Sequence, residues 1–364
     1  MKLKIKTELL KTLITKASKA STNNKMIPLT GLMNIQLTDG ILSITTSDAV
    51  NFLTLREENI EGDNFSVVVL VDLFSKLVAK TTSDTITLDY TDNKLSFIGN
   101  GTYDITLPLD EEGKPITYPS YDTTLTNCQT GTLKLATVKS IILANKPALA
   151  VSMEVPYLTG YYCNKDKVVS ADSFNICINK VDTFPEDVLI SPIVFDLLSL
   201  SETEDINYEF TETAMVFKTP KMTLCTKNMK GKEDYPIDAV TSYIDNEFPS
   251  KCTLPKTALI NVLDRLSLFI SNFDINGVVL NFTNEGVKVC SVNGSGYELI
   301  PYQGSENFAP YSCKVVVDAT KKQIAARNGE IVNICYGADG ALKFVDNNVI
   351  QIIALMGDDD EEEE

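Results

Sequence analysis

Apolar positions along this chain follow a helical period in some segments and a strand period in others, and the order repeats. In residues 7–20, Leu10, Leu13 and Ala17 share one face of a 3.6-residue period, which predicts an amphipathic helix. Two alternating apolar runs come next, separated by Asp39-Gly40, a dipeptide that favours a tight hairpin. The chain therefore opens as a mixed α+β protein.

The same unit recurs at intervals of about 120 residues. Each copy has a strand, an amphipathic helix, two strands around a turn, a second short helix and a closing hairpin. The predicted helices are 7–20, 72–80, 138–144, 194–200, 256–266 and 319–327. The predicted strands include 32–37, 41–46, 65–71, 85–90, 95–98, 157–163, 167–171, 206–210, 215–218, 277–282, 287–292, 331–336 and 341–345. Three copies in one order predict an α+β fold of three repeated domains.

The length of 364 residues fits such a division, since domains usually span about 100 to 200 residues. We expect domains at 1–122, 128–246 and 247–357, followed by a disordered acidic tail at 358–364. Apolar residues make up 44% of the chain and charged residues 22%, which is a globular composition. No apolar run is long enough to span a membrane, and the first residues lack a signal-peptide core. We expect a cytoplasmic protein with no membrane partner.

Histidine is absent, which excludes Ser-His-Asp and Cys-His catalytic systems and histidine-ligated metals. The eight cysteines are far apart, without the Cys-x-x-Cys spacing of zinc and redox motifs. We interpret them as small apolar residues in a reducing compartment. No Gly-rich phosphate loop is present either. The sequence thus predicts a protein that is not an enzyme, with no cofactor and no metal.

The formal charge of −17 argues at first against a nucleic-acid partner, because DNA affinity comes from Lys and Arg. The distribution is uneven, however. Six segments around the predicted helices (7–25, 72–80, 134–147, 192–202, 256–265 and 318–328) together carry +8, which leaves −25 for the rest. The segment 192–202 is the exception at −2, with Asp196 and Glu202. Basic helices in an acidic body suit a protein that holds DNA on one surface only.

The order of several short motifs resembles the bacterial DNA polymerase III beta sliding clamp family across nearly the whole chain. In the first copy the matching residues are Glu8, Leu10, Pro28, Asp39-Gly40, Leu42-Ser43, Thr45 and Asp48. In the later copies they are Tyr157-Leu158-Thr159-Gly160, Ala171-Asp172, Ile270-Ser271-Asn272 and the strand-like segment 352–356. The sequence leaves open whether the source is a bacterium or an infecting phage.

The resemblance implies three clamp-fold domains with helices inside and sheets outside, and two chains joined head to tail into a ring. Such a ring encircles duplex DNA without reading its sequence and tethers the replicative DNA polymerase for processive synthesis. Ring opening would require a separate ATP-dependent clamp loader. The expected DNA contacts are Lys11, Lys16, Lys19, Lys25, Lys76, Lys80, Lys139, Lys146, Arg265, Lys321, Lys322 and Arg327. Each of them could instead simply solvate an exposed helix face.

Two protein-binding sites follow from the same resemblance. A partner-peptide cleft would include Leu158, Ala171, Ile176, Pro236, Ile352, Ala354 and Met356, and Ala171 and Ala354 replace larger family residues. The dimer interface would bring Tyr103 and Ile105 against Phe269 and Ile270. Without the resemblance, ordinary core positions are the better explanation of the cleft residues, and the dimer-interface residues fit either explanation equally well.

Two alternatives remain open from the sequence. The acidic tail either only aids solubility or screens the cleft against acidic peptides. The chain as a whole could also be a clamp-like decoy or interaction platform that binds replication proteins without encircling DNA.

Overall fold

The computed structural model describes residues 1–270, 276–338 and 340–357. The predicted acidic tail at 358–364 and the motif residues Ser271 and Asn272 lie outside these ranges. No helix within the described ranges is long and apolar enough to cross a bilayer.

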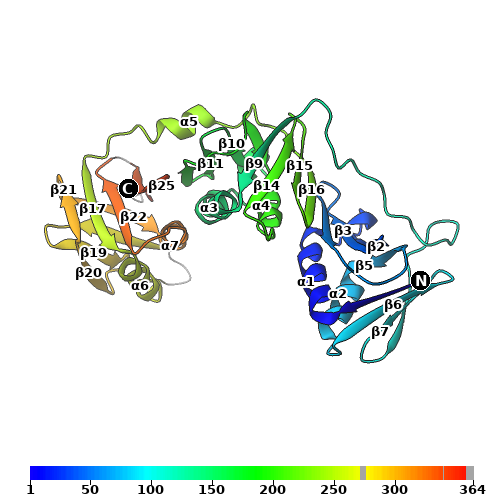
Figure 1. Cartoon of the computed structure of the whole chain (residues 1–364). Helices are drawn as coiled ribbons and strands as arrows, with labels where there is room; N and C mark the ends of the chain where they lie inside the picture. The colour runs from blue at the N-terminus through cyan, green and yellow to red at the C-terminus, as the bar shows by residue number, and fades with distance from the viewer. Residues whose placement is uncertain (271–275, 339, 358–364) are drawn as a thin grey trace. The chain divides into compact units, whose positions relative to one another are not determined.

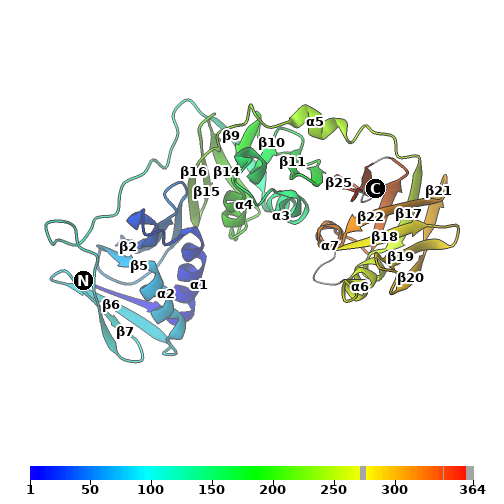
Figure 2. The same ribbon diagram turned by 180° about the vertical axis from the view of Figure 1, so that it is seen from behind.

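One unit of eight strands and two main helices occurs three times along the chain. Each copy has two four-stranded antiparallel sheets, and the order of the strands within these sheets is the same in all three copies. The first copy contains β1 (Lys2–Lys6), α1 (Thr7–Ala17), β2 (Leu32–Thr38), β3 (Ile41–Ser47), β4 (Phe52–Glu57), β5 (Phe65–Leu70), α2 (Val71–Lys80), β6 (Thr85–Thr91), β7 (Lys94–Ile98) and β8 (Thr102–Ile105). Figures 1 and 2 show α1 and α2 side by side, and the two helices pack on each other.

The second copy repeats this order and adds a short helix before the third. Its elements are β9 (Gln129–Lys134), α3 (Leu135–Asn145), β10 (Tyr161–Cys163), β11 (Val168–Ala171), β12 (Asn175–Asn179), β13 (Val188–Ile190), α4 (Pro192–Leu198), β14 (Asp205–Phe210), β15 (Ala214–Thr219), β16 (Met222–Lys227) and α5 (Ile237–Ser242).

The third copy inserts one extra short strand, β21 (Gly304–Glu306), which pairs with the first strand of the copy. Its other elements are β17 (Ser250–Pro255), α6 (Lys256–Ser267), β18 (Gly277–Phe282), β19 (Gly286–Ser291), β20 (Tyr297–Pro301), β22 (Tyr311–Val316), α7 (Val317–Ala325), β23 (Ile331–Tyr336), β24 (Ala341–Asp346) and β25 (Val349–Ala354). The predicted α+β class and the three repeats are confirmed.

Neighbouring copies are joined by edge-to-edge strand pairing. β4 of the first copy pairs with β16 of the second, so that their sheets merge into one of eight strands. β12 of the second copy pairs with β25 of the third, which gives a sheet of nine strands with β21. By contacts the chain divides into two compact units, Met1–Val138 with Ile193–Asn228, and Lys139–Pro192 with Met229–Glu364. The division passes through the middle copy, because each half of that copy shares a sheet with a neighbour. The residue boundaries of the three domains therefore stay a prediction.

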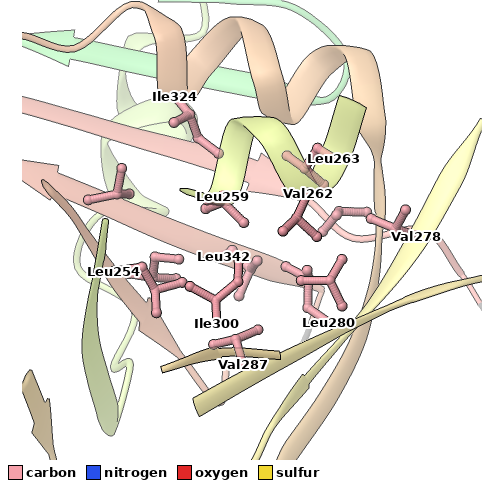
Figure 3. Close-up of a cluster of buried hydrophobic side chains, with 14 of the residues drawn as sticks. Leu254, Leu259, Val262, Leu263, Val278, Leu280, Val287, Ile300, Ile324 and Leu342 are labelled. Carbon is pink, nitrogen blue, oxygen red and sulfur yellow. The ribbon is translucent and has the colours of Figure 1, made fainter. Parts of the chain in front are cut away.

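The apolar faces of helices and sheets meet in dry cores. In the third copy, Leu259, Val262 and Leu263 of α6 point into a cluster with strand residues such as Leu280 and Leu342 (Figure 3). All five side chains are at most 4% exposed. Burial of this kind is the main stabilising contribution in such a domain, at about 25 cal/mol per Å² of apolar surface.

Two differences from the predicted elements have clear causes. The predicted strand 157–163 begins only at Tyr161, because Pro156 opens a 3₁₀ turn over Pro156–Thr159 and proline cannot donate to a strand ladder. The sequence prediction also named no strand at β4, β12, β13, β16, β20, β21 or β22, and it left the stretch of β8 unassigned. Apart from the extra strand β21, all of these lie at the ends of the four-stranded sheets.

Candidate functional site

Exposed lysines on or next to the helices form the first candidate site. Lys19, Lys25, Lys80, Lys139 and Lys322 are exposed, and within the described ranges none of them has a carboxylate within ion-pair distance. Lys146 is also exposed. Ammonium groups of this kind can meet phosphates at little desolvation cost. These six residues remain the most suitable of the predicted DNA contacts.

Other predicted DNA contacts already have carboxylate partners. Lys11 lies 3.1 Å from Glu8 and Lys76 lies 2.6 Å from Asp72, each within one helix. Two pairs join separate elements: Lys321 binds Asp264, and Arg265 binds Glu298 at 2.6 Å. The Arg265 hydrogen bonds lower the pKa of Glu298, so this carboxylate stays charged. A phosphate would have to compete with these carboxylates.

Glu202, the acidic residue that conflicted with a basic helical surface, lies in an ion-pair network. Its carboxylate accepts a hydrogen bond from Lys16 Nζ at 2.7 Å and lies 3.7 Å from Lys221 Nζ. Lys221 also pairs with Glu57 at 3.0 Å. The hydrogen bond from Lys16 is the largest cause that lowers the pKa of Glu202. Glu202 is therefore locally neutralised, and Lys16 is half-buried and committed to it.

The position of Arg327 argues against its predicted contact with DNA. It follows α7 in the chain, and its side chain is only 4% exposed. A guanidinium buried to this degree cannot lie on an open DNA-facing surface. The reason is that one face of α7, with Thr320 and Gln323, is polar in sequence but buried in the fold. Arg327 continues this buried face just after the helix.

A pocket of about 480 Å³ occupies the place predicted for the peptide cleft. Six of the seven predicted residues line it: Leu158, Ala171, Ile176, Pro236, Ile352 and Ala354. Its floor lies at the β12–β25 junction, where Ile176 is opposite Ile352. Concave, mainly apolar surfaces of this size are typical ligand sites.

The loop between β11 and β12 forms one rim of the pocket. Asp172 Oδ1 accepts hydrogen bonds from the backbone N–H groups of Phe174 and Asn175, both at 2.7 Å. This turn leaves the Phe174 ring 67% exposed at the pocket edge, and Tyr243 after α5 is 51% exposed. The sequence prediction missed both aromatic residues. Among the described residues that line the pocket, Asp172 is the only charged one.

Met356, the seventh predicted cleft residue, lies elsewhere. Its backbone N–H donates to the Lys314 carbonyl at 2.9 Å, and its Sδ lies close to Gly277. Met356 therefore packs against β18 and β22, beyond the end of β25, and does not line the pocket.

The predicted dimer-interface residues fall at two separate sheet edges. Tyr103 is 46% exposed on β8, the last strand of the sheet β1-β6-β7-β8. Phe269 is 50% exposed after α6, close to β20 at the edge of the other four-stranded sheet, since Asn293 before β20 donates to its carbonyl. Ile105 is 6% exposed and Ile270 half-buried, so both contribute mainly to the core. Tyr103 thus lies on an end strand, and its place in a dimer interface stays a prediction.

Comparison with solved structures identifies the fold. The DNA polymerase sliding clamp from Bacillus subtilis matches with a TM-score of 0.84 at 19% sequence identity, over 98% of this chain and 99% of that chain. DNA polymerase III subunit beta from Borrelia burgdorferi matches with a TM-score of 0.85 at 17% identity, over 98% and 99%. The beta subunit from Thermotoga maritima gives 0.80 at 15% identity, over the same shares. The chain thus has the sliding-clamp fold along nearly its whole length.

Sequence comparison alone does not reach this result. No protein-family model matches the chain, and no curated protein matches it. The similarity is therefore one of fold, and the function has to be argued from the residues of this chain.

Proposed function

We propose that two copies of this chain close head to tail into a ring that encircles duplex DNA and tethers a replicative polymerase for processive synthesis. In this proposal the chain is not an enzyme. It acts in the cytoplasm, and an ATP-dependent loader opens the ring. The pattern of strand pairing between the repeats is the observation that carries the proposal.

Both internal junctions follow one rule. The last strand of a copy pairs with the fourth strand of the preceding copy: β16 with β4, and β25 with β12. Two equivalent strands take no part in these junctions: β8, the last strand of the first copy, and β20, the fourth strand of the third. Both lie at sheet edges, and neither has a second strand partner within the described ranges. A second copy of the chain can satisfy both edges by the same rule, which gives a closed ring.

Exposed apolar side chains accompany both free edges. Tyr103 lies on β8, and Tyr297 and Leu299 of β20 are 66% and 43% exposed. Next to β20, Leu268 is 81% exposed and Phe269 50%. Large apolar residues gathered along an unpaired strand favour association. Pairing would bury them and add backbone hydrogen bonds.

The internal junctions also fix the expected register on the β8 side. Leu224 of β16 and Gln351 of β25 are among the residues that pair across the first and second junction. Within its own hairpin each is the cross-strand partner of a buried phenylalanine, Phe217 or Phe344. Tyr103 is likewise the cross-strand partner of buried Phe97. Tyr103 therefore takes the equivalent place on β8.

On the β20 side, Glu298 takes the place of the partners in those pairs. Leu224 pairs with Leu53 and Gln351 with Cys177. Both partners lie one residue after the first paired residue of their strand, as Glu298 does after Tyr297. The expected inter-subunit pair is therefore Tyr103 with Glu298.

Cysteine crosslinking tests this register. With Tyr103→Cys and Glu298→Cys in the same chain, mild oxidation should give a covalent dimer on a non-reducing gel. The control combines Tyr103→Cys with Leu299→Cys, whose side chain points to the opposite face of the sheet in this register. Each single variant reports the background from the native cysteines. A monomer in solution, or equal crosslinking of both pairs, would contradict the proposed ring.

The apolar pocket at the second junction would bind the polymerase. We propose that a short peptide of the polymerase inserts apolar side chains between Ile176, Ile352 and Ala354. The support is the pocket size, the apolar lining and the exposed Phe174 at its rim. The exposed lysines Lys19, Lys25, Lys80, Lys139, Lys146 and Lys322 would meet DNA phosphates without base contacts, which permits sliding.

A further inference from the structure

A second, smaller pocket lies between α3, α7 and the turn that joins β24 to β25. Its volume is about 150 Å³. Polar groups make up much of the lining, with Ser140, Asn179, Arg327 and Asp346 on the walls and exposed Asn347 at the mouth. Neither the proposed ring nor the peptide cleft uses this pocket.

The Arg327 guanidinium in this pocket has no hydrogen-bond acceptor among the residues that the structure describes. Its Nε, Nη1 and Nη2 atoms are all buried and unsatisfied. The guanidinium carbon lies 5.5 Å from the centre of the Phe344 ring, so one face contacts an aromatic surface. Asp346 attracts it, yet among the described residues no carboxylate lies within ion-pair distance of it.

Burial lowers the pKa of Arg327 to about 10, which still leaves the group positively charged at neutral pH. A buried cation is costly unless an anion or a set of acceptors compensates it. Further positive charge is close by, because the Lys256 ammonium donates to the Arg327 carbonyl at 2.5 Å. Lys139, next to Ser140, is exposed. The pocket lining thus holds one cation, Arg327, and one carboxylate, Asp346, and both lysines lie outside the lining.

We propose that this pocket binds a small oxyanion of the phosphate class, held by the planar fork of the Arg327 guanidinium. Five N–H donors in a plane match two oxygens of such an anion. Asn179 Nδ2 donates to Ser140 Oγ at 3.1 Å, which leaves the Ser140 hydroxyl hydrogen free to donate to the anion. At about 30 Å³ per water molecule, the pocket has room for a tetrahedral anion and a few waters. The burial of Arg327 favours free phosphate over a phosphate of the DNA backbone as the source of this anion.

Thermal unfolding of the full chain, with sodium phosphate titrated at constant ionic strength, tests the site. The wild-type Tm should rise with phosphate, since the folded state alone binds the anion. Arg327→Met should abolish this rise. The matched control is Arg56→Met, at a half-buried arginine of the first repeat whose Nη1 donates to Thr223. This control should keep the wild-type response. Equal responses in wild type and Arg327→Met would overturn the proposal.

If Arg327→Met does not fold, Asp346→Asn provides a second test of the phosphate site. Removal of the one carboxylate in the pocket should move the phosphate response to lower concentration, by at least several-fold. A weaker response than that of wild type would overturn the proposal, because Asp346 would then be helping binding.

Binding to a short DNA duplex separates the two sources of phosphate. If the anion is a backbone phosphate, Arg327→Met weakens duplex binding, and inorganic phosphate competes with the duplex. If it is free phosphate, duplex binding is unchanged while the thermal response is lost. Either result is independent of ring closure, so failure of the site would leave the clamp proposal intact.

Discussion

Lys16 Nζ lies 2.7 Å from Glu202 Oε1 and thereby links the first helix of the chain to the segment after α4 in the middle repeat. The acidic character of that segment had seemed incompatible with a basic DNA-facing surface. The ion pair resolves this conflict, because Glu202 is neutralised by Lys16 and by Lys221. It also withholds Lys16 from DNA.

Loss of the Glu202 charge should therefore strengthen DNA binding. Glu202→Gln frees Lys16 for a phosphate, while Lys221 keeps Glu57 as its partner, and should raise affinity for duplex DNA several-fold at low salt. The slope of log affinity against log salt should steepen by about 1, the effect of one added phosphate contact. Glu212→Gln, at an exposed acid in the β14–β15 turn, is the control and should leave the slope unchanged. An unchanged slope in Glu202→Gln would mean that Lys16 does not reach DNA.

The same pair should make stability depend on pH with a defined sign. The folded-state pKa of Glu202 is lowered, so the contribution is present above the unfolded pKa and lost as pH falls through the folded value. Wild type should exceed Glu202→Gln in stability at pH 7 by about 0.5 kcal/mol, because the pair is partly exposed. The difference should shrink as the pH falls below the ordinary value for Glu. Urea unfolding at several pH values measures it, and a difference that grows on acidification would refute the assignment.

Lys139 should contribute directly to DNA binding. It is exposed, and Lys139→Ala should weaken duplex binding at every sequence alike and reduce the salt slope by about 1. Lys227→Ala, at an exposed lysine of β16, provides the control and should have no effect. Salt titrations of fluorescent duplex binding give both quantities. Equal losses in the two variants would point to a general charge effect.

Phe174 should contribute to peptide binding at the apolar pocket. Its ring is exposed at the rim, so Phe174→Ala should leave the fold intact while it weakens peptide binding about 5- to 50-fold, the usual cost of losing an aromatic contact. Phe308→Ala removes a comparable exposed ring outside the pocket lining and should leave binding unchanged. Calorimetry with a polymerase-derived peptide distinguishes the two. Unchanged affinity in Phe174→Ala would exclude this rim from the peptide site.

Hydrophobic periodicity predicts the helices of this fold well. α1 begins at Thr7 and α6 at Lys256, as the sequence indicates, because each helix has a clear apolar face. The junction strands were harder to predict. β12 is buried by the neighbouring repeat, and its pairing partner β25 lies some 175 residues further along the chain. No local pattern can report such a partner.

The candidate sites were predicted less completely, for two physical reasons. Arg327 continues the polar face of α7, yet that face is buried, so amphipathicity gave the wrong surface. Phe174 and Tyr243 lie in a turn and after a short helix, where exposure depends on tertiary structure. Six of the seven cleft residues nevertheless came together in one pocket. Their positions came from the family resemblance, since their apolar character alone is equally typical of core residues.

Retention on circular DNA tests the central claim most directly. The full-length protein would be loaded on a nicked circular duplex by its cognate loader with ATP, and its half-life on DNA measured before and after the circle is cut once. A closed ring should remain on the circle in high salt and leave within seconds of linearisation, because it slides off the free ends. Equal retention on circular and linear DNA, or none on either, would contradict the ring and favour a platform that does not encircle DNA.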